Sequence, residues 1–318
     1  MTKDRYLQAV RGLAIIAVVL IHCLPRSVFS LAVRPFLNWA VAAFIFLSGY
    51  LTNEHKVAEG GVLVRRLCKI LPPYVAWSVL YAVVLQHLSL SGIVKAVFTG
   101  GAAAQMYFLF IYAQLTLLTP VLYRVLRSRR VLVYAICPVA LLGHEVATAM
   151  GFGHPVVARL FPMWMIFYVV GLDWGHWRHL VEGKFERWLF VTCACLCIQL
   201  ISGFAWNDFG DYSMATTQLK LSSMATSLAT IGVIMSLPLT MRKGVSSSVL
   251  ARLGDVSFGV YLSHILVLAI VGKCLGYLAL PGLVVTGAIW ILTLCGSWLF
   301  VVAAKEILPD KIAALLGC

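Results

Sequence analysis

This sequence has few charged residues and fewer acidic ones. Only 12% of its 318 residues are charged, and Asp and Glu together number 12, whereas 61% of the residues are apolar. Soluble globular domains carry about 25% charged residues, and no polar stretch here is long enough to fold as a separate soluble domain. The composition therefore excludes a soluble enzyme or binding module and indicates one integral membrane domain over residues 1–318.

Several catalytic and metal-binding signatures are also missing. The nine cysteines form no C-x-x-C pair, so we expect them to act as small apolar side chains and not as a redox or zinc site. The sequence has no Gly-x-Ser-x-Gly nucleophile motif, and His144-Glu145 lacks the second histidine of a metalloprotease helix. His176 and His179 have no evident third ligand, so we predict no metal site.

Ten apolar segments have roughly the length that crosses a bilayer. Because lipid offers no partner to unpaired backbone groups, α-helices are the expected element. The sequence therefore predicts an all-α membrane protein, a bundle of about ten transmembrane helices. Their approximate limits are 6–24, 36–54, 71–88, 105–123, 131–150, 160–175, 188–205, 214–239, 254–272 and 282–303.

Basic residues are concentrated in alternate loops between these segments. Eighteen of the 25 lysines and arginines fall on one side of the predicted bundle and five on the other, and this bias places both termini in the cytoplasm. Such loops face acidic phospholipids, so we expect membrane lipids and no nucleic acid as partners. The predicted cytoplasmic residues are Lys3, Arg5, Lys56, Arg65, Arg66, Lys69, Arg124, Arg127, Arg129, Arg130, Arg178, Lys184, Arg187, Arg242, Lys243, Arg252, Lys305 and Lys311.

Arg11 and His22 lie inside the first segment, where an ionisable side chain costs roughly 2.5–3.5 kcal/mol and usually has a function. Eleven residues at about 100° each bring a helix to within about 20° of its start, so both should lie on one face. At about 1.5 Å per residue they stand roughly 16 Å apart, about half of the hydrocarbon thickness. The pattern favours a lined cavity, in which the two could form a structural pair, a proton relay or a catalytic site.

Two other membrane segments carry polar side chains. Ser257, Tyr261 and His264 recur at i, i+4 and i+7, which places them on one helical face. Gln105 and Tyr107 add polar groups at the start of the fourth segment. Polar stripes in apolar helices are expected to face the interior of a bundle, where they can contact a substrate.

A basic cluster precedes the third segment. Arg65, Arg66 and Lys69 come just before a predicted helix start at Pro72-Pro73. Most basic loops only determine topology. These three cations are held close to the membrane surface, where they could bind a phosphate-bearing cytosolic ligand.

Four segments occur in a recognisable order. They are Arg11 followed after ten residues by His22, Phe44-Ile-Phe-Leu-Ser48-Gly49-Tyr50-Leu51, Arg66-Leu-Cys-Lys69-Ile-Leu-Pro72-Pro73-Tyr74, and Ser257-Phe-Gly-Val-Tyr261-Leu-Ser-His264. In this order the chain resembles, over essentially its whole length, the acyltransferase-3 family of membrane acyltransferases, which modify bacterial surface sugars. Two positions depart from the family pattern. Lys69 stands where Arg is more common, and Gln105 begins a segment that usually starts with His.

The resemblance implies an enzyme of the bacterial cytoplasmic (inner) membrane that transfers an acyl group, usually acetyl from acetyl-CoA. The acceptor would be a hydroxyl of a lipid-linked or cell-surface sugar, and acetyl-CoA would be a donor substrate, with no permanently bound cofactor. The implied roles are catalytic for His22, as general base, and Arg11; acyl-CoA-binding for Arg65, Arg66 and Lys69; and acceptor-binding for Gln105, Tyr107, Ser257, Tyr261 and His264.

Two other functions remain open. A proton-linked transporter or flippase could use Arg11 and His22 as a relay, although the halves show no inverted repeat. A catalytically silent sensor or scaffold of the same fold is compatible with Gln105. An acyltransferase releases free CoA thiol, whereas a transporter or a scaffold does not, so this release distinguishes the first function from the other two. The sequence singles out neither one acceptor nor an oligomer interface.

Overall fold

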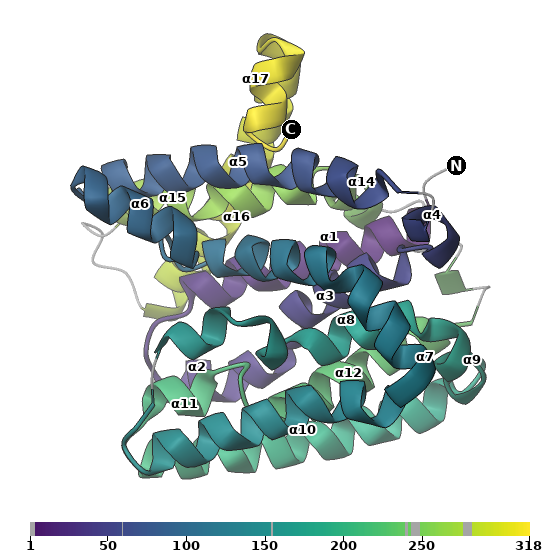
Figure 1. Cartoon of the computed structure of the whole chain (residues 1–318). Helices are drawn as coiled ribbons and strands as arrows, with labels where there is room; N and C mark the ends of the chain where they lie inside the picture. The colour runs from purple at the N-terminus through teal and green to yellow at the C-terminus, as the bar shows by residue number, and fades with distance from the viewer. Residues whose placement is uncertain (1–3, 59, 154, 239–240, 243–248, 276–281) are drawn as a thin grey trace.

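The computed structural model describes residues 4–58, 60–153, 155–238, 241–242, 249–275 and 282–318, and every regular element among them is helical (Figure 1). Lys3 and Lys243, which the charge pattern assigned to the cytoplasm, lie outside these residues. The first half contains α1 (Arg5–Cys23), α2 (Val28–Val33), η1 (Arg34–Phe36), α3 (Trp39–Tyr50), α4 (Glu54–Ala58), α5 (Val62–Val84), α6 (Leu90–Thr99) and α7 (Met106–Ala149). The second half contains η2 (Pro155–Arg159), η3 (Phe161–Met163), α8 (Met165–Leu172), α9 (Trp174–Val181), α10 (Phe185–Asp208), α11 (Tyr212–Thr216), α12 (Leu221–Ser236), α14 (Val249–Asp255), α15 (Ser257–Leu275), α16 (Gly282–Ile307) and α17 (Asp310–Leu315).

Within the described ranges, eight helices are long and apolar enough to cross a membrane. One of them, α7, has non-helical φ/ψ at Arg129 and so combines the two predicted segments 105–123 and 131–150. Large apolar side chains such as Val131 and Phe190 are exposed on α7 and α10, as expected for surfaces in contact with lipid. The chain is a multi-pass membrane protein.

The sixth predicted segment, 160–175, does not form one long helix. It contains the short η3 and the eight-residue α8. Eight residues rise about 12 Å, less than half of the hydrocarbon thickness, so α8 alone does not cross the bilayer. A count of ten spans therefore stays a prediction.

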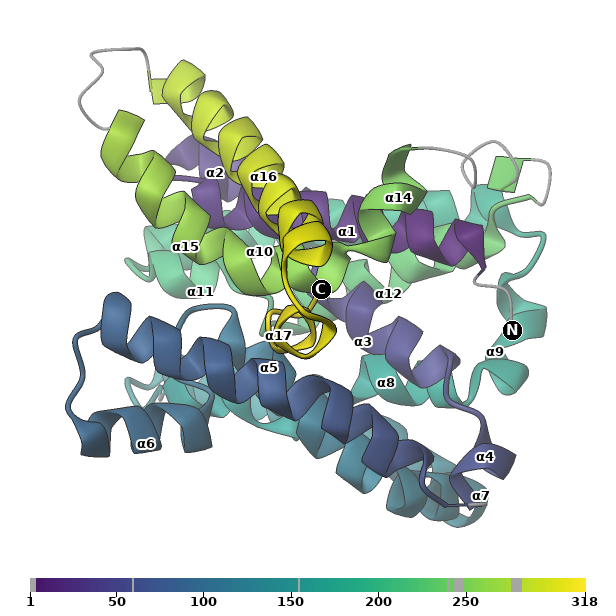
Figure 2. The same ribbon diagram turned by 90° about the horizontal axis from the view of Figure 1, so that it is seen from above.

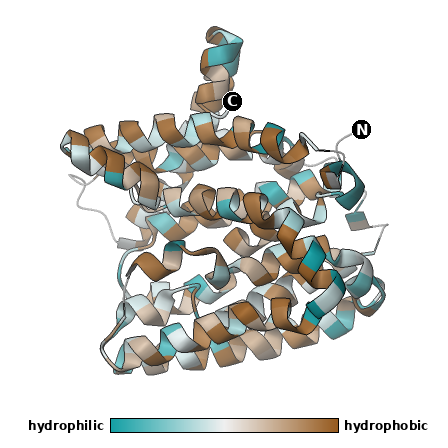
Figure 3. Ribbon diagram, in the orientation of Figure 1, coloured by the Kyte–Doolittle hydropathy of each residue, from teal (hydrophilic) through white to brown (hydrophobic). Residues whose placement is uncertain are grey.

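The basic loops meet at one end of the bundle. Figures 1 and 2 both place the N-terminus, α4, α9 and α14 at the right-hand end, and Figure 3 shows hydrophilic residues gathered near α4 and α9. Ion pairs connect α7 to this end, from Arg127 to Glu54 of α4 at 2.6 Å and from Arg130 to Asp173, which precedes α9, at 3.1 Å. The gathering of these cations fits the charge bias, and the assignment of this end to the cytoplasm stays a prediction.

The helix α1 is the most buried of the candidate spans and lies among α3, α14, α15 and α16. It contacts α14 backbone to backbone, because a Cβ on Gly254 would lie 1.8 Å from the carbonyl oxygen of Gln8. A Cβ on Gly12 would similarly lie 2.0 Å from the carbonyl oxygen of Leu250. This close packing fixes α1, which carries Arg11 and His22, against its neighbours.

The third predicted segment starts at a different residue from the one expected. The sequence indicated a start near Pro72-Pro73, but α5 begins at Val62 and contains both prolines in its interior. A proline inside a helix removes one hydrogen bond and clashes with the preceding turn, which made the pair look like a helix boundary. Arg65, Arg66 and Lys69 consequently lie on the first turns of α5 and not in a loop.

Candidate functional site

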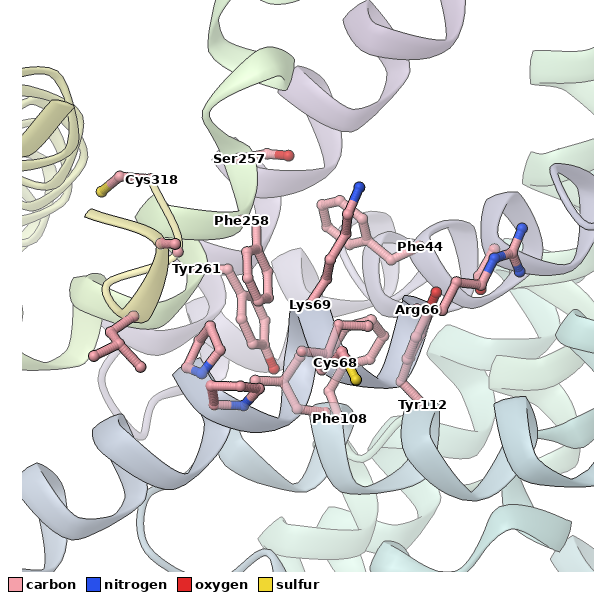
Figure 4. Close-up of a pocket in the computed structure, with 18 of the residues that line it drawn as sticks. Phe44, Arg66, Cys68, Lys69, Phe108, Tyr112, Ser257, Phe258, Tyr261 and Cys318 are labelled. Atoms are coloured by element: carbon pink, nitrogen blue, oxygen red, sulfur yellow. The ribbon is translucent and has the colours of Figure 1, made fainter. Parts of the chain in front are cut away.

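A cavity of about 830 Å³, here called the basic cavity, opens between α1, α3, α5, α7, α15 and the C-terminal residues (Figure 4). Arg11 from α1, Arg66 and Lys69 from α5, and Lys311 from α17 line it. No Asp or Glu is among the described residues in its wall. The described wall of the cavity therefore presents four cationic side chains and no Asp or Glu side chain, which suits an anionic ligand.

The helical position of the cluster on α5 explains which cations reach the cavity. Residues three apart lie on one face of a helix, so Arg66 and Lys69 both line the wall. Arg65 is rotated by about 100° from Arg66 and is exposed outside the cavity. Arg66 is also fixed at the end of α3, because it donates hydrogen bonds to the hydroxyl of Thr52 and, at 2.9 Å, to the carbonyl of Leu51.

The prolines of α5 change the wall of the basic cavity. Pro72 and Pro73 have no backbone N–H, so the carbonyls of Cys68 and Lys69, four residues earlier, lose their helical donors. All four residues line the cavity. In this section of α5, two backbone carbonyls thus lack the usual helical donor four residues later.

A second, smaller cavity, here called the histidine cavity, has a volume of about 210 Å³. His22, at the end of α1, lines it together with Arg34 of η1 and the predicted acceptor residues Gln105 and Tyr107. Thr216, Thr217 and Gln218, from the end of α11 and the segment that follows it, add further polar residues to its wall. The buried Nε2 and Oε1 of Gln105 and the buried Oε1 of Gln218 have no hydrogen-bond partner among the described residues.

Tyr261 of α15 is the one described residue common to both cavities. Its hydroxyl donates a hydrogen bond to the backbone carbonyl of Gln105, and its ring centroid lies 5.2 Å from that of Phe108. The side chain is thus held between α15 and α7 where the two cavities approach each other. The polar residues predicted on this helical face do not all line the same cavity, because Ser257 lines only the basic cavity. Its hydroxyl donates a hydrogen bond of 2.8 Å to the carbonyl of Gly254.

His264 lies beside His22, with the ring centroids 5.2 Å apart. Its Nδ1 is 2.7 Å from the carbonyl oxygen of Tyr261, and because a carbonyl only accepts hydrogen bonds, Nδ1 carries the proton. In the neutral ring, Nε2 then holds the free lone pair. This Nε2 is fully buried and has no partner among the residues that the structure describes. The backbone thus fixes a histidine acceptor next to His22.

The structure therefore divides the residues that the sequence singled out. Arg11, Arg66, Lys69 and Ser257 belong to the basic cavity, and His22, Gln105 and Tyr107 belong to the histidine cavity. Sequence reasoning missed Arg34, Gln218 and Lys311. Arg34 and Lys311 were counted only as loop cations, and nothing in the sequence distinguished Gln218 from other loop residues. No group of three or more His, Cys, Asp or Glu residues that could hold a metal ion occurs in the described part of the chain.

The comparison with family models gives one match. Residues 4–302 match the model of the acyltransferase-3 family, described as an acyltransferase domain. This range contains both cavities except for the C-terminal residues 311–318 of the basic cavity. No curated protein and no solved structure matches the chain.

Proposed function

Because this chain belongs to the acyltransferase-3 family, we propose that it transfers an acetyl group from acetyl-CoA to a hydroxyl of a lipid-linked or cell-surface sugar. The observation that carries this proposal is the pair of cavities, one basic and one lined by His22, which approach each other at Tyr261. Donor and acceptor could thus enter from different sides and meet inside the protein. The proposed location is the bacterial inner membrane, with the basic cavity open to the cytoplasm.

The basic cavity suits the donor. Acetyl-CoA carries phosphates, which Arg11, Arg66, Lys69 and Lys311 can bind as cations. Its pantetheine arm contains amide N–H groups, which can donate to the carbonyls that Pro72 and Pro73 leave without helical partners. The volume of about 830 Å³ is within the range of ordinary cofactor pockets.

The histidine cavity suits the acceptor and the chemistry. His22 takes the proton of the acceptor hydroxyl as the hydroxyl oxygen attacks the thioester carbonyl carbon. The new C–O bond forms and the C–S bond breaks, and the proton passes from His22 to the CoA thiolate, so that an ester and free CoA leave. The Nε2 of His264 accepts a hydrogen bond from His22 while His22 carries the proton, and so stabilises that state.

The test is transfer of label from radiolabelled acetyl-CoA in membranes that contain wild type, His22→Ala or His179→Ala. His179 is an exposed histidine on α9 and serves as the control. We expect His22→Ala to lower incorporation by roughly 10²–10⁴-fold, the usual contribution of a general base, while acetyl-CoA binding stays close to wild type. Normal transfer by folded His22→Ala would refute the assignment, and an absence of CoA thiol release by wild type would refute acyl transfer itself.

A further inference from the structure

Arg34 is the only Lys or Arg among the described residues that line the histidine cavity, and no Asp or Glu lies in that wall. None of the ion pairs between described side chains involves Arg34. A largely buried charge is costly unless it is paired or hydrogen-bonded. The cavity thus contains a cation whose counter-ion the described part of the protein does not supply.

The position of Arg34 is fixed by the end of α1. Its Nη2 donates a hydrogen bond of 3.1 Å to the carbonyl of Ile21, the residue before His22. That carbonyl has no helical donor, because the residue four positions later is Pro25. The bond holds the guanidinium next to His22.

This capping bond uses only one of the five N–H donors of the guanidinium. The Nε of Arg34 is buried and has no partner among the residues that the structure describes. Two further groups of the same wall lack partners, since the amide of Gln105 and the Oε1 of Gln218 are buried without hydrogen bonds in the described structure. Capping of α1 therefore explains one donor of Arg34 and leaves its Nε and these buried amide atoms unexplained.

We propose that the histidine cavity binds an anionic acceptor, and that Arg34 holds a carboxylate or phosphate group of this acceptor beside His22. This inference rests on the proposed acyl transfer and specifies its acceptor class. Guanidinium groups bind carboxylate and phosphate through paired N–H donors, and Gln105 and Gln218 are placed to contact the remaining hydroxyls. Anchoring the anion fixes which hydroxyl reaches His22, so Arg34 also selects the position of the new ester.

The experiment compares wild type, Arg34→Gln, Arg34→Lys and Arg26→Gln in the radiolabelled transfer assay. Arg26 is exposed near the same end of α1 and stacks on Tyr212, so Arg26→Gln removes the same charge outside the cavity. We expect Arg34→Gln to lower incorporation at least tenfold at unchanged KM for acetyl-CoA. We expect Arg34→Lys to retain part of the activity and Arg26→Gln to match wild type.

The labelled product identifies the anion. It should be retained on an anion-exchange resin, and mild acid, which cleaves sugar phosphates from a lipid carrier, separates the two sources. A product that becomes neutral carried its anion in the phosphate linkage to the lipid, whereas a product that stays anionic carries the anion on the sugar, as a carboxylate or an acid-stable phosphate, and either result supports the proposal. A neutral product from wild type overturns it.

The remaining outcomes separate this proposal from other roles of Arg34. An equal loss of sugar acetylation and of thioester hydrolysis without acceptor in Arg34→Gln would mean that Arg34 stabilises the reacting oxyanion or the fold, and would overturn acceptor recognition. Incorporation that does not depend on His22 overturns the proposed mechanism. Absence of label with wild type overturns both proposals, whereas a neutral, His22-dependent product overturns only the anionic acceptor.

Discussion

Substitution of His264 by Asn or by Gln tests the roles of its two ring nitrogens separately. The amide nitrogen of Asn reaches approximately the position of Nδ1 and can keep the hydrogen bond to the Tyr261 carbonyl, which is 2.7 Å long for His264. The longer Gln reaches the region of Nε2, which is buried without a partner in the described structure and lies on the ring next to His22. The two variants therefore preserve different halves of the imidazole.

The expected magnitudes follow from the partners of each nitrogen. Loss of a neutral hydrogen bond such as that from Nδ1 costs about 1 kcal/mol of folding free energy. A hydrogen bond from a charged His22 to the Nε2 of His264 would contribute about 1.5–3 kcal/mol in the transition state, so its loss corresponds to a decrease in kcat of roughly 10–150-fold. We therefore expect His264→Asn to be the more stable variant and His264→Gln to be the more active one.

The assay combines thermal unfolding with the rate of CoA thiol release, and KM for acetyl-CoA serves as the control because His264 does not line the basic cavity. A normal kcat in His264→Asn would show that Nε2 takes no part in the reaction. If the variant that loses more stability also loses more activity, His264 has a structural role only.

Two further predictions concern the basic cavity and the packing of α1. Lys69→Glu should weaken acetyl-CoA binding by about tenfold, or about 1.4 kcal/mol, whereas Arg65→Glu, outside the cavity, should have little effect in equilibrium binding; equal effects would place the phosphates outside the basic cavity. Gly254→Ala should destabilise the fold by at least about 1–3 kcal/mol through overpacking, because its Cβ would lie 1.8 Å from the Gln8 carbonyl oxygen, whereas Gly272→Ala meets no atom within 4 Å and should be neutral or slightly stabilising. Thermal unfolding measures the stability of the two glycine variants, and a stable Gly254→Ala would contradict the close contact of α1 and α14.

The long apolar helices could be predicted from the sequence because segment length and hydropathy depend on local composition alone. The same applies to Arg11 and His22, since a charge in an apolar helix needs a cavity, and both residues line one. Helix periodicity predicted that Ser257, Tyr261 and His264 lie on one face of a helix, and all three are in α15, although periodicity could not show that Ser257 and His22 belong to different cavities.

Features that depend on tertiary contacts could not be predicted in this way. Prolines such as those at 72 and 73 often end a helix, yet α5 continues through them and packs against α6, α7 and α17. The proposed role of Arg34 depends on a carbonyl that Pro25 leaves without its helical donor and on a cavity wall built from distant segments. A cation in a short loop carries no sequence signal that distinguishes this role from a topology signal.

The arrangement of the two cavities has a consequence for unwanted hydrolysis of the thioester. Tyr261 is buried, forms part of both cavity walls and is held by its hydrogen bond to the Gln105 carbonyl. A thioester in the basic cavity is therefore separated from His22 by a side chain that is fixed at both its backbone and its hydroxyl. Under the proposed function, the acyl group must pass this ring to react, and an acceptor that fills the histidine cavity excludes water from His22 at that moment. If both proposals hold, the cations of the two cavities have one common effect, because each substrate is held by its anionic group while its reacting atom is placed near Tyr261.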